Sequence, residues 1–579
     1  MKKKSGKYTS LLANMKDEWK WLFKYIRRYK LNILLYIVLG VFSTVMGLGT
    51  SVATKRLIDS VVSHSDSTII GEACVVIGLA VFNIVFGSLA SWVTAVVSSK
   101  VNNEIRQEIF SNVLTSDWED INSFHSGDLL NRLEGDVSAV SSGIINFVPN
   151  VITRSVQFLG AFAIVLYYDA TMAFLALMSA PVLFISSKFL VRTMRKYNLQ
   201  SRELNGKILS YSEESMQNIQ VIKAFDLTKQ YISNFRGVLE SYRKVRLSYE
   251  KFSVILSMCL SLMGLLVSYA CYGWGVYRLW QGLISYGTMT MFLQLSGTLS
   301  SSFSSLASLA PGAVSIATAA GRIMEITSYE KEEDRDREKA EKIINSSKET
   351  GVNVVFEKVS FTYRDGETPV LQDVSFTARP GETIALVGPS GEGKTTILKL
   401  VLGLLRASSG RTYIESQPGE TIDISDSTRR FCSYVPQTMN VFSGTIGDNL
   451  RIVKKEATVE ELQRVLETAD LWSFVSSLPE GLDTVIGEHG ANLSQGQIQR
   501  ISIARALLCD SMILLMDEAT SSLDIETEKR VLRNIMVSDP KRVCIITTHR
   551  ESMLRYSDRI YKVTADGSFA EVDRKEYTD

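Results

Sequence analysis

The pattern of hydrophobic and polar positions divides the chain into two halves of different character. Before about residue 320, apolar stretches recur that are each long enough to cross a bilayer, which takes about 20 helical residues. After that point, short apolar runs alternate with helical patterns, as they do in α/β domains. The sequence therefore predicts an α-helical transmembrane domain followed by an α/β domain.

The apolar stretches predict six membrane-spanning helices. They cover residues 31–53, 69–97, 144–167, 171–191, 252–278 and 288–310. Before the first stretch, Trp19–Arg28 mixes aromatic and basic side chains. This segment is either an amphipathic helix in the membrane interface or the solvated start of the first span.

The placement of Lys and Arg predicts the orientation of the spans. Residues 192–250 are rich in both, whereas the connections 59–68, 168–170 and 279–287 contain neither. The positive-inside rule then places both termini and both long loops in the cytoplasm. These two loops have helical, polar patterns, so we expect the membrane helices to continue beyond the bilayer.

Polar residues inside the predicted spans are candidates for a cargo path. Arg154 and Gln157 interrupt the third span, and a polar stripe follows one face of the sixth, made of Thr290, Gln294, Thr298, Ser301, Ser305 and Ser308. The stripe either lines a translocation cavity or packs against a neighbouring helix. Arg154 could equally pair with a partner inside the helix bundle.

A phosphate-binding loop is the clearest motif of the second half. Residues 388–395 read G-x-x-x-x-G-K-T, after an apolar run and before a helical pattern. In such a loop the backbone N–H groups and the helix N-terminus bind phosphate oxygens. Lys394 would reach the β- and γ-phosphates, and Thr395 would bind Mg²⁺. The remaining candidate contacts are Gly388, Ser390, Gly391, Gly393 and Thr396.

Two carboxylates follow an apolar run further along the chain. Residues 512–516 would form a buried strand that delivers Asp517 to the Mg²⁺ shell, while Glu518 could polarise the attacking water. Downstream, residues 543–548, which are β-branched except for Cys544, lead to His549, which is either catalytic or structural. Apolar runs that end in acids are common, so this pattern alone is weak. Because it follows a phosphate loop in the same domain, it is strong here.

Other segments have both a nucleotide-binding and a purely structural interpretation. Ser494, Gly496 and Gln497 lie where a γ-phosphate could bind, or Ser494 simply caps a helix. Gln437 could touch Mg²⁺ or water, or be solvated. Asp524, in the segment 521–524, could belong to a turn and cap. Tyr363 could stack on adenine, or pack in the core.

Composition bears on the class of partner and on the domain boundaries. The 63 Lys and Arg nearly balance 62 Asp and Glu, which gives no support for a nucleic-acid partner. A charged run at 330–342 reads as an exposed helix or loose tether. We therefore expect a membrane domain over 1–328, a linker over 329–350 and a nucleotide-binding domain over 351–579. The six cysteines form no C-x-x-C pair, and the four histidines show no metal-ligand spacing.

Taken together, these motifs resemble those of the ATP-binding cassette (ABC) family over nearly the whole chain. The segment 388–395 is similar to its Walker A motif, 512–518 to Walker B and 493–497 to its signature. Gln437, 521–524 and His549 are similar to its Q-loop, D-loop and switch histidine, and Tyr363 to its adenine-stacking aromatic. The signature segment differs from the family's usual pattern at two positions: Gln495 replaces the usual Gly, and Ile498 stands where a polar or basic residue is common.

The membrane half resembles the exporter branch of the family. Its loop segments 126–133 and 220–225, and the segment 485–490 before the signature, are similar to exporter segments that contact one another. The resemblance implies a half-transporter that forms a homodimer or heterodimer, binds ATP and Mg²⁺ between the two chains, and exports a drug-like molecule, lipid or peptide by alternating access. It also implies an integral membrane protein in contact with lipid, which we expect in a bacterial plasma membrane. An ATP-gated channel, a regulatory subunit and an importer on the same fold are the alternatives.

Overall fold

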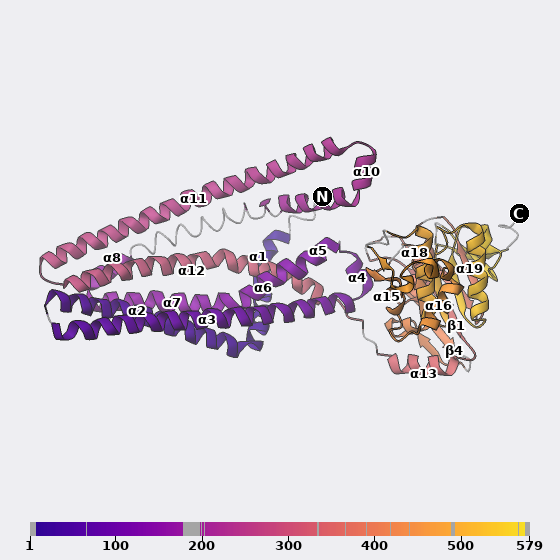
Figure 1. The fold of residues 1–579 in the computed structure, drawn as a ribbon, viewed down its shortest axis with the longest axis horizontal. Helices are drawn as coiled ribbons and strands as arrows, with labels where there is room; N and C mark the ends of the chain where they lie inside the picture. The colour runs from indigo at the N-terminus through magenta and orange to yellow at the C-terminus, as the bar shows by residue number, and fades with distance from the viewer. Residues whose placement is uncertain are drawn as a thin grey trace. The chain divides into compact units, whose positions relative to one another are not determined.

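The chain folds into two compact units. The computed structural model describes residues 7–573, except 65, 125, 178–196, 198, 199, 202, 333, 334, 365, 367, 390, 417, 418, 439, 440, 488–491, 565 and 566. One unit comprises Met1–Leu114 and Phe124–Tyr329, and the other Thr115–Ser123 and Glu330–Asp579. Figure 1 shows the first as long helices and the second as sheets covered by shorter helices.

Long helices dominate the first unit. They are α1 Lys7–Arg28, α2 Lys30–Val62, α3 Asp66–Thr115, α5 Ser126–Asn131, α6 Val137–Ser142, α7 Val148–Tyr168, α8 Ala170–Leu177, α10 Ile219–Ala224, α11 Thr228–Trp280 and α12 Tyr286–Thr327. Two π-helical turns, Arg132–Asp136 and Gly143–Phe147, join α5, α6 and α7 into one nearly continuous rod. α3 and α11 extend well beyond the stretches predicted to cross the bilayer, as expected.

Three helical segments among the described residues are long and apolar enough to cross a membrane. They are Lys30–Val62, Thr68–Thr115 and Gly127–Tyr168, and they contain the first three predicted spans. Large apolar side chains on their surface are exposed, including Leu31, Phe42 and Ile84, as suits a lipid environment. The fourth predicted span lies mostly outside the described residues. The fifth and sixth lie within α11 and α12, so the total of six remains a prediction.

The basic aromatic segment before the first span is a helix of its own. α1 ends at Arg28 and α2 begins at Lys30, with Tyr29 between them. Leu22, Tyr25 and Tyr29 are buried against Ile105 of α3 and Ile323 of α12. This arrangement favours a separate amphipathic helix over a simple extension of the first span.

The second unit is an α/β domain. Its helices are α4 Trp118–Asn122, α13 Arg337–Ser347, α14 Lys394–Val401, α15 Ile446–Arg451, α16 Val459–Thr468, α17 Trp472–Ser477, α18 Gln495–Leu508, α19 Ile525–Ser538 and α20 Glu551–Leu554, with 3₁₀ turns at Asp426–Phe431 and Gly481–Asp483. Its strands are β1 Val352–Phe361, β2 Leu371–Ala378, β3 Thr383–Val387, β4 Ser409–Ser416, β5 Thr421–Asp423, β6 Cys432–Val435, β7 Gly444–Thr445, β8 Val485–Ile486, β9 Ile513–Asp517, β10 Val543–Thr547, β11 Arg559–Val563 and β12 Phe569–Val572.

The strands form two main sheets and one small pair. The larger sheet has the order β12-β11-β3-β10-β9-β6, in which β11, β3, β10, β9 and β6 are parallel and β12 is antiparallel. The second sheet, β2-β1-β4-β5, is antiparallel, and β7 pairs with β8. The β3, β9 and β10 strands follow the predicted apolar runs because buried parallel strands are apolar on both faces.

The charged run after residue 329 contributes to this unit. Much of it is exposed, but α13 buries Ala340 and Ile343 in the same core as Val354 and Ile414. Part of the run is therefore a helix, but the prediction that it is exposed was wrong for Ala340. An apolar residue placed once per helical turn among charges gave the helix one buried face.

Candidate functional site

The phosphate loop connects β3 to α14 as the sequence predicts. Gly388, Gly391 and Gly393 have φ angles of 142°, 92° and 99°, which only glycine adopts readily. A Cβ at Gly388 would lie 2.3 Å from the carbonyl oxygen of Val563. The glycines therefore let the backbone curl tightly in front of the N-terminus of α14, where phosphate oxygens bind. Ser390 lies outside the described residues.

Lys394 begins α14 and folds back over this loop. Its ammonium donates to the carbonyl oxygens of Gly388 at 2.5 Å and Pro389 at 2.7 Å. Burial lowers the pKa of Lys394, and the carboxylates of Glu518, Glu392 and Asp517 oppose that shift. A partly desolvated cation within the loop is suited to bind phosphate oxygens.

Thr395 and Asp517 meet across the parallel sheet. The Thr395 hydroxyl donates to Asp517 Oδ2 at 2.9 Å, although the two residues are 122 positions apart. Asp517 also accepts a hydrogen bond of 2.7 Å from Thr547 and one of 3.4 Å from Tyr434. This donor set of a hydroxyl and a carboxylate suits a hard cation such as Mg²⁺.

The hydrogen bonds that Tyr434 and Thr547 donate to Asp517 were not predicted from the sequence. Tyr434 is the penultimate residue of β6 and Thr547 ends β10, so the parallel order of the strands brings both to Asp517. Burial, followed by the charge of Asp517, raises the pKa of the Tyr434 phenol. The phenol therefore keeps its proton and remains a hydrogen-bond donor that holds the Asp517 carboxylate in place.

The three predicted catalytic residues converge on one carboxylate. Gln437 Nε2 donates to Glu518 Oε2 at 2.9 Å, and His549 Nε2 lies 3.6 Å from Glu518 Oε1. Glu518 has a φ of 47°, a left-handed conformation that non-glycine residues seldom adopt, and its backbone N–H donates to the Thr547 hydroxyl at 2.9 Å. This backbone turn directs the carboxylate toward the loop residues that follow β6 and β10.

The signature segment confirms the helix-cap interpretation and adds a close contact. Ser494 caps α18, since its hydroxyl accepts from the N–H of Gln497 while the Gln497 side chain accepts from the N–H of Ser494. A Cβ at Gly496 would lie 3.2 Å from the carbonyl oxygen of Ser522. The unusual Ile498 is buried at 5% exposure, so it stabilises α18 by packing. His489 and Glu488 lie outside the described residues.

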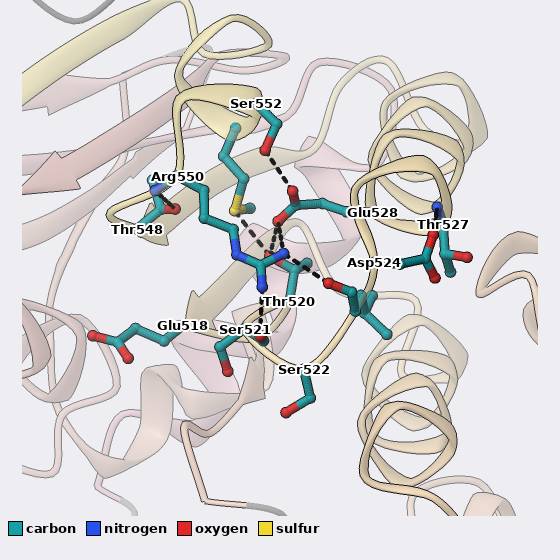
Figure 2. A network of polar contacts seen from close by, with 12 residues as sticks. Glu518, Thr520, Ser521, Ser522, Asp524, Thr527, Glu528, Thr548, Arg550 and Ser552 are labelled. Atoms are coloured by element: carbon teal, nitrogen blue, oxygen red, sulfur yellow. Dashed lines mark hydrogen bonds and ion pairs between the residues drawn. The ribbon is translucent and has the colours of Figure 1, made fainter.

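The loop after Glu518 is fixed by a polar network (Figure 2). Arg550, next to His549, donates to the carbonyl oxygen of Ser521 at 2.5 Å and to that of Leu523 at 2.8 Å. On the other side, Gln499 of α18 accepts from the N–H of Ser522 at 3.0 Å. Asp524 then caps α19 by accepting from the N–H of Thr527 at 3.0 Å. The turn-and-cap interpretation of this loop is therefore confirmed.

A buried carboxylate lies at the centre of that network. The Glu528 side chain has 0% exposure, accepts hydrogen bonds of 2.5 Å from Thr520 and from Ser552, and lies 3.4 Å from Arg550 (Figure 2). A buried charge needs such partners. The network therefore ties the loop that carries Glu518 to the loop that carries His549. Sequence reasoning missed Glu528 and Arg550, because spacing does not reveal their burial.

Tyr363 stands beside the phosphate loop. Its ring meets Phe361 edge to face at 4.8 Å, and its hydroxyl lies 3.1 Å from that of Thr396. Thr396 itself is buried in α14. Tyr363 thus packs partly against the core while remaining near the helix that begins at Lys394.

The short helix α4 contacts the same region of the second unit. The ring of Trp118 lies 4.4 Å below the Lys399 ammonium of α14, and Arg364, next to Tyr363, donates its N–H to Glu119 at 2.8 Å and bonds Asp120 through its side chain. These contacts could not be predicted from the sequence, because α4 is five residues long and separated from α14 by more than two hundred positions.

A polar cavity of about 450 Å³ lies among the helices of the first unit. Arg154, Gln157 and Thr298 line it, as do residues of α2 and α3. Among the described side chains of the predicted polar stripe on α12, which leave out Ser308, Thr298 is the one that lines this cavity. Thr298 and Ser301 donate to carbonyl oxygens of their own helix. Arg154 bonds Gln157 of its own helix at 2.9 Å.

The fold and these motifs define an ABC transporter. Residues 33–303 match the family described as "ABC transporter transmembrane region", and residues 371–521 match the family described as "ABC transporter". The chain belongs to the ABC transporter family and joins both of its domains in one polypeptide. It is an integral membrane protein with an ATP-binding domain that couples ATP hydrolysis to transport.

Similar proteins agree over nearly the full length. The chain is 28% identical to an uncharacterized ABC transporter ATP-binding protein of Bacillus subtilis (strain 168), covering 96% of this chain and 92% of that one. It is 25% identical to a multidrug resistance ABC transporter ATP-binding and permease protein of Lactococcus lactis subsp. lactis, covering 96% and 93%. Its fold matches a bacterial Atm1-family ABC exporter with ATP bound, at a TM-score of 0.80 and 21% identity, covering 95% and 96%.

The likeness in fold extends to the order of the domains, a helical membrane domain followed by the ATP-binding domain. A chain with one domain of each kind is a half-transporter, and this architecture implies a dimer. The sequence prediction of family and fold class is thereby confirmed.

Proposed function

We propose that the chain is an ATP-driven exporter that works as a dimer and moves an amphipathic cargo, such as a drug-like molecule, lipid or peptide, by alternating access. The observation that carries the proposal is the meeting of Gln437, Glu518 and His549 beside the Thr395–Asp517 pair. A channel or a purely regulatory subunit has no need of a complete hydrolytic set. The exporter fold and the named multidrug relative support export.

Each residue has a role that its contacts support. The loop 388–395 would hold the β- and γ-phosphates through backbone N–H groups and the Lys394 ammonium. Thr395, Asp517 and Gln437 offer the oxygen ligands that Mg²⁺ prefers. When bound, Mg²⁺ neutralises charge on the phosphates. Tyr363 would stack on the adenine ring.

Hydrolysis would depend on Glu518. Its carboxylate would accept a proton from water while the water oxygen bonds to the γ-phosphorus and the bond from that phosphorus to the leaving ADP oxygen breaks. Gln437 and His549, which both lie at this carboxylate, would keep it oriented toward the water. The Arg550 network would hold the loops that carry Glu518 and His549 in register.

The partner chain would complete the site. Within one chain, Ser494 and Asp524 cap their own helices, while the phosphate loop and Glu518 group around the ends of β3 and β9. A second half-transporter would bring its Ser494, Gly496, Gln497 and Asp524 to the γ-phosphate. Since this chain carries both half-sites, a homodimer and a heterodimer are both consistent with it.

The charge pattern supports a location for the chain. By the positive-inside rule, the arginine- and lysine-rich loops would put the N-terminus and the nucleotide-binding domain in the cytoplasm of a bacterial cell. ATP added outside inverted vesicles should then drive cargo into the vesicle lumen. Cargo leaving the lumen would instead identify an importer.

The test of the proposal is hydrolysis by the full chain in lipid. Glu518→Gln should keep ATP binding within about threefold and lower turnover by about a hundredfold or more, because general-base catalysis contributes about 10²–10⁴. The matched control is Glu460→Gln, an exposed carboxylate on α16 that should leave turnover unchanged. Undiminished hydrolysis in Glu518→Gln would exclude Glu518 as the base.

A further inference from the structure

The cavity in the membrane unit has a largely polar lining. It lies among α2, α3, α7 and α12, and its volume of about 450 Å³ falls within the ~300–1,000 Å³ range typical of small-molecule sites. Hydroxyl and amide side chains from these helices face it, among them Ser43, Thr44, Asn83, Asn150, Thr153 and Thr298. Polar groups in a membrane unit are costly unless they face protein, water or a ligand.

Most of the hydroxyl donors in the lining are already used within the protein. Thr44 donates to Gly40, Thr153 to Pro149 and Thr298 to Gln294, each to a carbonyl oxygen of its own helix. Ser43 donates to the side chain of Asn83 at 2.7 Å. The lone pairs of these hydroxyls can still accept a hydrogen bond from a ligand, but their protons are already donated within the protein.

Arg154 differs from the rest of the lining. Among the described residues around the cavity it alone carries a formal charge, and its recorded bond is one of 2.9 Å to the neutral oxygen of Gln157. The guanidinium stays protonated and has several N–H donors in a planar fork. Its side chain is exposed. A fixed positive charge with donors to spare therefore opens onto the cavity.

The position of Arg154 along α7 indicates how deep this charge would lie in a bilayer. Arg154 precedes Tyr168, the last residue of α7, by about 21 Å at ~1.5 Å per residue. At that end Asp169 pairs with Arg278 at 2.7 Å, as expected near a membrane surface. The predicted third span, 144–167, also contains Arg154. Since the hydrocarbon core is about 30 Å thick, we infer that Arg154 lies within it. A cation at that depth requires water or an anion to stabilise it.

We propose that this cavity binds an amphipathic anion, with Arg154 as the residue that recognises its carboxylate, sulfonate or phosphate group. The proposal rests on the proposed export function, whose cargo it restricts. An alkylammonium ion would meet like-charge repulsion and no carboxylate in the described lining. A neutral amphipath would leave the Arg154 charge uncompensated.

The test uses two fluorescent probes that differ in the sign of charge. A pyrene-labelled dodecanoate and the pyrene-labelled dodecylammonium of equal length are titrated onto the full chain in nanodiscs of zwitterionic lipid, followed by anisotropy. The anion should bind more tightly. Arg154→Gln should weaken anion binding by about ten- to a hundredfold, as expected for loss of a charge-assisted hydrogen bond. Arg154→Lys should restore most of it, and Arg154→Glu should favour the ammonium probe.

Arg56→Gln provides the matched control, because Arg56 is an exposed arginine on α2 that does not line the cavity. It should leave both affinities unchanged. Equal binding of the two probes, or equal loss in Arg154→Gln and Arg56→Gln, would overturn the proposal. Arg154→Lys keeps the charge and so separates loss of the site from loss of folding.

A second arm identifies the source of the anion. Lipids with anionic phosphate headgroups are added to the bound anionic probe. If they displace the probe from the wild type but not from Arg154→Gln, the site binds a lipid headgroup. If the probe stays bound, the site binds a free amphipathic anion. Binding is measured without ATP, so its failure can be told from failure of hydrolysis. A chain that hydrolyses ATP but does not prefer the anion keeps the proposed function and loses this inference.

Discussion

Removing Arg550 tests how the loops around the hydrolytic site are held together. Arg550→Met keeps much of the side-chain length but removes the charge and its donors. Glu528 would then keep its negative charge at 0% exposure with hydroxyl partners alone. The carbonyl oxygens of Ser521 and Leu523 would lose their donor as well.

The size of the effect follows from burial. Leaving one member of a buried ion pair uncompensated costs about 3–5 kcal/mol. The Arg550 side chain is 34% exposed, so water screens the pair, and two hydroxyls still bond Glu528. We therefore expect the lower end, about 3 kcal/mol. Glu528→Gln should cost about 1–2 kcal/mol, because the amide can still accept a hydrogen bond. The double variant should cost less than the sum, with a coupling of about 1–2 kcal/mol.

Hydrogen exchange of the full chain measures these values locally. Peptides covering residues 518–532 report the free energy of local opening, which needs no two-state unfolding of the whole protein. Lys529→Met is the matched control on α19, the helix that carries Glu528, because the ion pair of Lys529 with Glu526 is solvent-exposed. It should change protection by about 0.5 kcal/mol or less. If Arg550→Met lowers the free energy of local opening no more than the control does, or if the double-mutant cycle of Arg550 and Glu528 shows no coupling, then Arg550 does not compensate the buried charge.

Three further predictions address separate contacts. Thr395→Val removes the hydroxyl bonded to Asp517, so the gain in ATP affinity on adding Mg²⁺ should fall about tenfold while Mg²⁺-free binding is retained; an undiminished gain would contradict the assignment. Cys544 should resist maleimide at about pH 8, because burial raises its pKa from 9.0 to about 11 and leaves about one thiolate in a thousand. The free energy of unfolding should fall as pH rises from 9 through 11, since the thiol of the unfolded chain loses its proton at a lower pH than the buried thiol. Rapid labelling detected by mass spectrometry would argue against that burial. Trp118→Ala should lower exchange protection of residues 115–123 by about 1 kcal/mol, because it removes the ring below Lys399, and unchanged protection would show that the contact is weak.

Much of the nucleotide site could be predicted because its parts are local in sequence. The glycines of 388–395 adopt left-handed φ angles that follow from residue type, and the strand before them and the helix after them follow from hydrophobic pattern. The same holds for Ser494 and Asp524, whose side chains cap the helices that begin next to them. Such features need only a few neighbouring residues.

The membrane half was predictable in outline for a different reason. Apolar stretches of sufficient length predict helices, because backbone polar groups must be satisfied internally in lipid. In the part of the chain that the structure describes, three of these helices are long and apolar enough to span a membrane, and α11 and α12 contain two more predicted spans. The sequence could not show which polar side chains share a cavity. The stripe on α12 looked continuous, yet Thr298 is the one member with a described side chain that lines the cavity.

The sequence by itself determined the two domains, the phosphate loop and the identity of the residues that carry the chemistry. The tertiary structure alone decided which of them meet. The parallel strands β3, β10, β9 and β6 lie side by side, so the loops after them bring Thr395, His549, Glu518 and Gln437 to one edge of the sheet. Strand order depends on packing across the whole domain, whereas spacing along the chain reports only on neighbours. For the same reason, the burial of Glu528 and the charge of Arg154 in a shared cavity emerged only from the folded chain.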